Sequence, residues 1–268
     1  MPDHYAVIGN PVAHSKSPAI HALFASGTQQ DMEYGRLLAP LDGFVNAVRN
    51  FIDKGGKGLN VTVPFKFDAF EMAMTLTQRA KMAGAVNTLS FQDGKVHGDN
   101  TDGAGLVADI TSNAGISLLD SRILLLGAGG AAYGVMLPLQ EQKPALIHIA
   151  NRSVDKAIDL AEQFSAFGKT SASAYEDLDE PFDIVINATS AGLSNTMPPV
   201  PKNVFGSRTL ALDMVYADRP TPFMEFAAQY GAQTRDGFGM LVEQAAESFF
   251  VWRGIKPQTG QVFTFFGR

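Results

Sequence analysis

Short apolar runs that end in glycine, proline or polar residues recur along the chain and predict buried β-strands. These runs cover residues 5–8, 58–64, 85–89, 123–126, 146–150, 182–187 and 209–216. Between them, apolar residues spaced three and four positions apart predict amphipathic helices. The helices are expected at residues 17–24, 44–52, 131–139, 153–164, 221–231 and 240–253. In the second half of the chain strands and helices alternate, which predicts an α/β fold with a parallel sheet.

The strand at residues 58–64 carries polar side chains on one of its two faces. Alternation places Asn60 and Thr62 on this face, opposite Leu59, Val61 and Val63. Lys66 lies just beyond the strand end. Two hydrogen-bonding side chains beside an amine are suited to hold a polyhydroxylated ring. An exposed strand face next to a surface lysine explains the same pattern, so both interpretations stay open.

Residues 14–18, His-Ser-Lys-Ser-Pro, predict the start of a helix, with Ser17 as its N-cap and Pro18 as its first residue. Ser15 and Ser17 then lie at the positive helix end, which is suited to a small carboxylate, although capping alone also explains Ser17. Further on, Asp93-Gly94 predicts a hairpin turn between residues 85–89 and 95–98. Asp102 follows this hairpin, and favouring the start of the next helix is its simplest role.

The apolar run at residues 123–126 ends in a glycine motif. Gly127, Gly129 and Ala132 fit G-x-G-x-x-A, which follows a predicted strand and opens a predicted helix. The first glycine permits a tight turn, the second lets a pyrophosphate approach the backbone, and the small third residue lets the helix pack close to the strand. The sequence therefore predicts a dinucleotide site at this turn.

The end of the next strand, at residues 146–150, indicates which dinucleotide is bound. Sites selective for NAD usually place an acidic residue here, on the ribose 2′-hydroxyl. Asn151 occupies that place, and Arg152, Ser153 and Lys156 offer partners for a 2′-phosphate. Capping of the following helix is the alternative role of Ser153. We take Asp155 as a helix-start residue that points to solvent, and we predict NADP rather than NAD.

Composition excludes several classes of function. The chain has 268 residues, enough for two domains of ordinary size or one large one, and 27 acidic against 21 basic residues give a net charge of −6. Without a basic cluster, a nucleic-acid or membrane-binding surface is not expected. The absence of cysteine and the five scattered histidines predict no metal site. Residues 123–139 carry no charge, but four glycines and Pro138 interrupt them, so we expect no membrane span and a cytoplasmic protein.

Seven segments, in their order along the chain, resemble those of the shikimate dehydrogenase family. They are Gly9-Asn-Pro-Val-Ala-His-Ser-Lys-Ser-Pro18, Asn60-Val-Thr-Val-Pro-Phe-Lys66, Ala83-Gly-Ala-Val-Asn-Thr88, Gly98-Asp-Asn-Thr-Asp-Gly103, Asn187-Ala-Thr-Ser-Ala-Gly192, Asp213-Met-Val-Tyr216 and Gly237-Phe-Gly-Met-Leu-Val-Glu-Gln244. The resemblance implies reversible, NADP-dependent reduction of 3-dehydroshikimate to shikimate, in the route to chorismate and aromatic amino acids. It further implies a small-molecule substrate and a monomer or homodimer.

The resemblance also implies the domains and the site residues. A substrate-binding domain is expected over residues 1–103, a Rossmann-like NADP-binding domain over 104–237, and a helical segment over 238–268 that returns to the first domain. Lys66 and Asp102 would be the catalytic pair. Substrate contacts would come from Ser15, Ser17, Asn60, Thr62, Asn87, Tyr216 and Gln244. The cofactor would be lined by Gly127, Ala128, Gly129, Gly130, Ala131, Asn151, Arg152, Ser153, Lys156, Thr189, Ser190, Met214 and Gly237.

The catalytic roles of Lys66 and Asp102 leave two possibilities. Reduction of a ketone needs a proton donor for the developing alkoxide, and the reverse reaction needs a base. Either the amine of Lys66 exchanges this proton, or it stays charged while Asp102 helps to move the proton; we favour the first. Three competing functions are a broader quinate/shikimate dehydrogenase, a non-catalytic NADP-binding regulatory module, and a dehydrogenase for a folate-like substrate. Ser17 and the missing strand-end acid argue against the first, and the presence of Lys66 and Asp102 argues against the second. The third would not need the paired serines or the face formed by Asn60 and Thr62.

Overall fold

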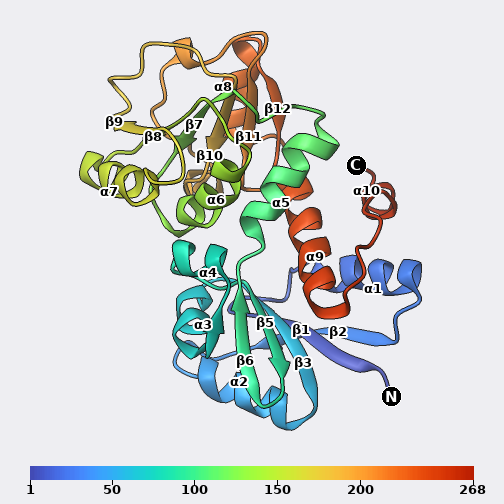
Figure 1. The fold of residues 1–268 in the computed structure, drawn as a ribbon. Helices are drawn as coiled ribbons and strands as arrows, with labels where there is room; N and C mark the ends of the chain where they lie inside the picture. Colours follow the sequence, from blue (N-terminus) through green and yellow to red (C-terminus); the bar gives the residue numbers. More distant parts are fainter. The chain divides into compact units, whose positions relative to one another are not determined.

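The computed structural model describes residues 1–268, with the exception of the Leu193 side chain. The chain divides into two compact units. The first comprises Met1–Gly105 together with Val242–Arg268, and the second comprises Leu106–Leu241 (Figure 1). Each unit is built on a six-stranded sheet in the part of the chain that the structure describes. The predicted α/β class is therefore confirmed.

The first unit holds a mixed sheet in the order β2-β1-β3-β5-β6-β4. The strands are β1 (Asp3–Gly9), β2 (Met32–Leu38), β3 (Gly56–Val61), β4 (Thr75–Leu76), β5 (Thr88–Gln92) and β6 (Lys95–Asp99). Strand β5 pairs antiparallel with both β3 and β6, while the other pairs are parallel. The helices are α1 (Ser17–Thr28), α2 (Phe44–Asp53), α3 (Lys66–Met72), α4 (Gln78–Ala83), α10 (Gly260–Phe265) and most of α9 (Phe238–Arg253).

Strand β3 shows both the strength and the limit of the alternation rule. Leu59 and Val61 are buried in the core, as predicted, at 0% and 2% exposure. Val63, expected on the same face, is 67% exposed. The strand ends at Val61, and a turn in which the Phe65 N–H donates to the Thr62 carbonyl leads into α3. Because Val63 lies in this turn, strand alternation no longer applies to it.

The hairpin predicted at Asp93-Gly94 is present. It joins β5 to β6, and both turn residues have positive φ, 51° for Asp93 and 71° for Gly94. Such a pair matches the twist of the two strands. Strand β5 starts at Thr88 rather than at Ala85, because residues 85–87 form the connection between α4 and the strand.

The second unit holds an all-parallel sheet in the order β12-β11-β10-β7-β8-β9. Its strands are β7 (Arg122–Leu126), β8 (Leu146–Ala150), β9 (Thr170–Ser173), β10 (Ile184–Asn187), β11 (Leu210–Asp213) and β12 (Gln233–Arg235). The helices include α5 (Asp102–Ala108), which begins in the first unit, α6 (Gly130–Glu141), α7 (Val154–Phe164) and α8 (Pro222–Gln229). The strand order reverses between β7 and β10, and ligands bind beyond the carboxyl ends of strands at such a point.

Several predicted boundaries shift in the structure. Strand β11 ends at Asp213, so the expected continuation to Tyr216 is wrong, and helix α1 runs on to Thr28. Helix α9 starts at Phe238 and ends, as predicted, at Arg253. Its second half returns to the first unit, as predicted: Trp252 donates to the Leu89 carbonyl at 3.0 Å.

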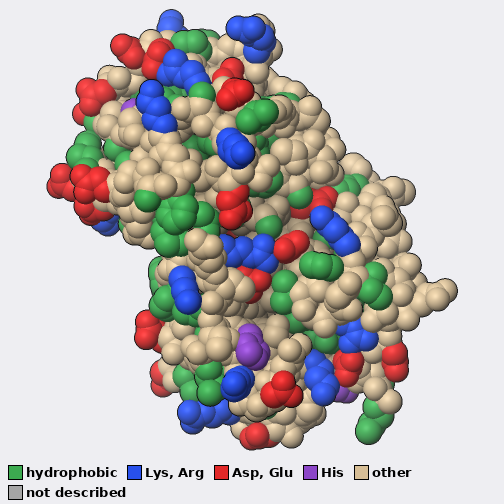
Figure 2. Space-filling view, in the orientation of Figure 1, with side chains coloured by type: hydrophobic (Ala, Val, Ile, Leu, Met, Phe, Trp, Pro, Cys, Tyr) green, Lys and Arg blue, Asp and Glu red, His purple; other side chains and the backbone are tan. Residues whose placement is uncertain are grey.

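Charged side chains of both signs are distributed over the surface (Figure 2). Lysine, arginine, aspartate and glutamate side chains are mixed over the face that Figure 2 shows, rather than gathered by sign. Across the described residues, none of the helices has the length and apolar character required to cross a membrane.

Candidate functional site

The Lys66 amine and the Asp102 carboxylate are in contact. Each is the first residue of a helix, Lys66 of α3 and Asp102 of α5. Lys66 Nζ donates to Asp102 Oδ2 at 2.5 Å. The side chains are 32% and 16% exposed, so the pair is shielded yet open to a small molecule. The structure thus brings together the two residues for which the sequence predicts catalysis.

Asn87 holds the other oxygen of Asp102. Its side-chain amide donates to Asp102 Oδ1 at 2.8 Å and to Thr101 Oγ1 at 2.9 Å, and it lies 3.2 Å from Gln244 Oε1. In return, the Thr101 N–H donates to Asn87 Oδ1 at 2.8 Å. Asn87 is 2% exposed and lies directly before β5. Both carboxylate oxygens of Asp102 therefore have a donor, one from Lys66 and one from Asn87.

Asn60 faces the interior of the first unit rather than an open surface. It is 6% exposed, and its Oδ1 accepts a hydrogen bond from the Tyr34 hydroxyl at 2.7 Å. Its amide donates to Ser248 Oγ at 2.9 Å and to Thr88 Oγ1 at 3.2 Å. Because protein groups already partner both polar atoms, Asn60 is placed to position its neighbours. Thr62, expected on the same strand face, lies one residue beyond β3 and is half-buried.

The two serines at the start of α1 are arranged differently from the prediction. Ser17 is the first helical residue, and Lys16 occupies the N-cap without a side-chain cap. The expected N-cap role of Ser17 is therefore wrong. Instead, the Ser17 N–H donates to Ser15 Oγ at 3.3 Å. Ser17 is 6% exposed, and its hydroxyl interacts with the Tyr34 hydroxyl.

Tyr34 was missed by the sequence analysis. It lies in β2, and its hydroxyl contacts both Asn60 and Ser17. Its ring stacks on the ring of His21 with centroids 4.1 Å apart and planes 6° apart. Burial raises the pKa of the Tyr34 hydroxyl well above its usual range, so the group acts as a neutral donor. The alternation of polar and apolar residues over 32–38 is the sequence signal that could have indicated this strand and its tyrosine.

The glycine loop in the second unit has the geometry that the motif predicts. Gly127 is buried at the end of β7 with a φ of +104°, a conformation that favours glycine. A Cβ atom at Gly127 would lie 3.0 Å from the Thr189 methyl, whereas a Cβ at Gly129 would meet nothing within 4 Å. Ala128, Gly129, Gly130 and Ala131 are at least partly exposed, and no side chain caps the start of α6. The helix N–H groups are thus left for a ligand.

Thr189 and Met214 are held by a buried network at the ends of β10 and β11. Asn187 Oδ1 accepts from Thr189 N at 3.1 Å and from its hydroxyl at 2.7 Å. Asn187 donates to Asp213 Oδ2 at 3.2 Å, and its carbonyl accepts from Met214 N at 3.0 Å. Burial raises the pKa of the Asp213 carboxyl, although hydrogen bonds from Thr221, Val215 and Asn187 act to lower it. A Cβ at Gly237 would lie 2.2 Å from the Met214 carbonyl oxygen, so only glycine fits there.

The predicted 2′-phosphate site lies between β8 and α7. Arg152, Ser153 and Lys156 are exposed, and the Asn151 amide donates to the Ser153 carbonyl at 2.9 Å. Ser153 occupies the N-cap of α7, but its hydroxyl makes no capping bond. The alternative role of Ser153 as a side-chain cap is therefore wrong, and the hydroxyl is left for a ligand.

Two more predicted residues of the second unit follow its strands. Ser190 lies exposed after β10. Tyr216 lies after β11, half-buried with its ring edge-on to Phe238 at 6.4 Å, and burial raises its hydroxyl pKa. An open glycine turn, uncapped helix N–H groups and a basic pair beyond the second strand fit a phosphorylated dinucleotide. The features of the second unit define a dinucleotide-binding dehydrogenase domain.

Comparisons with known proteins agree with this class. Residues 7–89 match the family described as the shikimate dehydrogenase substrate binding domain, residues 109–196 that of shikimate/quinate 5-dehydrogenase, and residues 237–262 the shikimate 5′-dehydrogenase C-terminal domain. A shikimate dehydrogenase (NADP(+)) from Janthinobacterium sp. (strain Marseille) is 61% identical over 97% of this chain and 96% of its own length. The chain belongs to the shikimate dehydrogenase family.

Solved structures show the same fold. An Ael1 enzyme from Pseudomonas putida is 46% identical with a TM-score of 0.95, covering 98% of this chain and 97% of that one. Shikimate 5-dehydrogenase from Thermus thermophilus, solved in complex with NADP(H) and shikimate, is 32% identical with a TM-score of 0.86, covering 96% and 95%.

Proposed function

We propose that this protein is an NADP-dependent shikimate dehydrogenase that catalyses the reversible reduction of 3-dehydroshikimate to shikimate. The contact of 2.5 Å between Lys66 Nζ and Asp102 Oδ2 carries the proposal. It provides an amine and a carboxylate side by side, partly open, in a chain 61% identical to a shikimate dehydrogenase (NADP(+)). A regulatory protein without catalysis would have no need to keep this pair intact.

The first unit binds the substrate in this proposal. Ser15 and Ser17 hold the carboxylate at the start of α1, where the positive end of the helix favours an anion. Thr62, Asn87 and Gln244 contact the ring hydroxyls. Tyr216 stays a predicted substrate contact, while Asn60 acts through its neighbours.

Proton transfer belongs to Lys66. In ketone reduction the ammonium group donates a proton to the developing alkoxide, and in the reverse direction the amine takes it back. Asp102 accepts a hydrogen bond from Lys66 through Oδ2 and is fixed by Asn87 through Oδ1, so it aims the amine. When bound, the cofactor would supply the hydride for ketone reduction as NADPH, and would accept it in the reverse direction as NADP.

The second unit binds NADP. Residues 127–131 receive the pyrophosphate through backbone N–H groups. Arg152, Ser153 and Lys156 bind the 2′-phosphate beside Asn151. Thr189, Ser190, Met214 and Gly237 line the remainder of the cofactor. A monomeric or homodimeric state and a cytoplasmic location stay predictions.

Rates measured with four substrate and cofactor pairs test the proposal. Absorbance at 340 nm is followed after the protein is mixed with shikimate or quinate, each with NADP or NAD. We expect fast reduction of NADP with shikimate, and much slower rates for the other three pairs. Comparable rates with quinate or with NAD would instead indicate the broader dehydrogenase, and no rate with any pair would contradict enzymatic function.

A further inference from the structure

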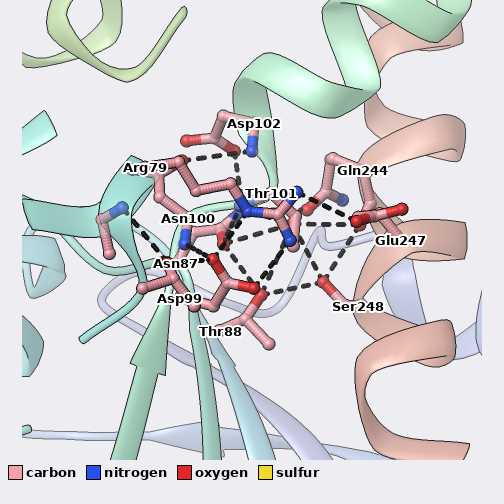
Figure 3. Close-up of polar contacts among 12 residues, drawn as sticks. Arg79, Asn87, Thr88, Asp99, Asn100, Thr101, Asp102, Gln244, Glu247 and Ser248 are labelled. Atoms are coloured by element: carbon pink, nitrogen blue, oxygen red, sulfur yellow. Dashed lines mark hydrogen bonds and ion pairs between the residues drawn. The ribbon is translucent and has the colours of Figure 1, made fainter. Parts of the chain in front are cut away.

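Arg79, in helix α4, joins two segments of the first unit that both carry proposed site residues (Figure 3). Its Nε and Nη2 donate to the two carboxylate oxygens of Asp99 at 2.7 and 2.6 Å. Its Nη1 donates to Glu247 Oε1 at 2.9 Å. One planar guanidinium therefore connects the end of β6 to helix α9.

Each partner of Arg79 lies close to groups of the proposed site. Asp99 is three residues before Asp102, its Oδ1 accepts from the Asn100 N–H at 2.7 Å, and its carbonyl accepts from the Asn87 N–H at 3.0 Å. Glu247 follows Gln244 by three positions in α9, so the two side chains lie on the same side of the helix. Displacement of either carboxylate would move Asp102, Asn87 or Gln244.

The setting of Arg79 favours a fixed geometry. Its side chain is 23% exposed, against 8% for Asp99 and 24% for Glu247. Burial alone would raise the pKa of the Asp99 carboxyl, but hydrogen bonds and charge from Arg79, together with donors at Thr77 and Asn100, hold it below its usual value. A shielded bidentate pair keeps its orientation better than an exposed ion pair, which gains little.

A hydroxyl chain continues from this connection into the site. Ser248, next to Glu247, lies 2.8 Å from the Thr88 hydroxyl and 3.0 Å from the Thr101 hydroxyl (Figure 3). Its hydroxyl also lies 2.9 Å from the Asn60 amide. Thr101 also donates to the Gln244 carbonyl at 3.1 Å. The position of α9 along its axis is thereby coupled to Thr101, the residue directly before Asp102.

We propose that Arg79 is a positioning residue, which sets Asp102 and Gln244 at their working separation by holding Asp99 and Glu247 together. This inference rests on the proposed function, since its effect is exerted on shikimate. Arg79 itself need not touch substrate. Its loss misplaces groups that bind and orient the ring, and a misplacement of about 1 Å costs up to about 100-fold in rate.

The test compares Arg79→Lys, Glu247→Ala and Glu247→Gln with the wild type. Arg79→Lys keeps the positive charge but loses the bidentate contact with Asp99, and Glu247→Ala removes the acceptor for Nη1. For both we expect KM for shikimate to rise roughly tenfold and kcat/KM to fall roughly 10- to 100-fold, while KM for NADP stays within about twofold. Glutamine keeps an acceptor oxygen for Nη1, so Glu247→Gln should restore KM to within about threefold of the wild type.

The matched control is Arg122→Lys. Arg122 makes a bidentate pair with Glu180 in the second unit, but the side chains are 37% and 54% exposed. We expect this variant to leave both KM values unchanged. A purely structural role for Arg79 would lower the amount of active enzyme, and hence apparent kcat, without changing KM for shikimate.

Two results would overturn the inference in different ways. An active wild type, with unchanged KM for shikimate in Arg79→Lys and Glu247→Ala, would contradict positioning and leave the proposed function intact. A wild type that does not reduce NADP with shikimate would contradict the proposed function and the inference together. If Arg79→Lys fails to fold, the Glu247→Ala and Glu247→Gln pair alone decides.

Discussion

Acid should destabilise the first unit through His21, a histidine at the centre of an aromatic cluster. His21 is 0% exposed in α1, with its ring stacked on Tyr34 and 5.5 Å from the ring of Trp252. Neither ring nitrogen makes a hydrogen bond of normal geometry. Burial lowers the pKa of His21 to about 3, and an interaction with the Asn60 side chain opposes this only partly.

The sign and size of the effect follow from linkage. The pKa of His21 falls from 6.5 in the unfolded chain to about 3 in the folded protein, so the unfolded state binds the proton first. Above pH 6.5 the imidazole is neutral in both states, so folding carries no penalty from His21. As the pH falls from 6.5 towards 3, protonation of the unfolded chain lowers the free energy of unfolding. At 1.36 kcal/mol per pH unit, the loss is about 2 kcal/mol between pH 7 and pH 5, and it approaches about 5 kcal/mol below pH 3.

Urea unfolding at a series of pH values measures this loss, with the fluorescence of Trp252 as the probe. Trp252 is the only tryptophan of the chain, and far-UV circular dichroism provides a second signal. His21→Phe keeps an aromatic ring in place, and His21→Ala opens a cavity, so alanine should lower stability at pH 7 by about 2–4 kcal/mol and phenylalanine should not.

Both variants remove the same titration. Between pH 7 and pH 5, each should therefore lose about 2 kcal/mol less than the wild type. Equal losses in the wild type and in both variants would refute the reasoning, because they would show that His21 titrates alike in the folded and unfolded states.

Three further substitutions give separate tests. Gly237→Ala places a methyl group 2.2 Å from the Met214 carbonyl oxygen, so stability should fall by about 1–3 kcal/mol and KM for NADP should rise. Gly206→Ala is the control, because a Cβ atom there meets nothing within 4 Å, and equal effects of the two substitutions would contradict the steric argument. Tyr34→Phe removes a buried hydrogen-bond donor, which should lower the free energy of unfolding in urea by about 1 kcal/mol and raise KM for shikimate about fivefold. An unchanged KM would show that the Tyr34 hydroxyl does not help to position the substrate. Arg152→Ala should raise KM for NADP about tenfold and leave KM for NAD as it is, and a parallel rise for both would exclude 2′-phosphate recognition.

The segments predicted best are those in which local pattern and tertiary structure agree. Strand β8 and the helix after the glycine motif form where expected because most of their apolar residues are buried. Strands β2, β4, β9 and β12 were not predicted. Strand β9 consists of Thr-Ser-Ala-Ser, and all four strands lie at a sheet edge, where burial is partial and the apolar pattern is weak.

The residues of the candidate site likewise fall into those that a local sequence motif indicates and those that only the folded structure brings together. Lys66, Asp102 and Asn87 were found because short motifs carry them. Tyr34 and Arg79 were not, because their contacts join distant segments: 26 positions separate Tyr34 from Asn60, and 168 separate Arg79 from its partner in α9. Spacing along a chain cannot show such pairs, which exist only after the sheet and α9 have packed together.

The role of the Lys66 amine is tested most directly by steady-state kinetics of Lys66→Ala with shikimate and NADP. Removal of a group that donates or accepts the transferred proton should lower kcat by about 100- to 10,000-fold, with a much smaller change in KM. A loss of the same size confined to KM, with kcat unchanged, would contradict proton transfer by Lys66.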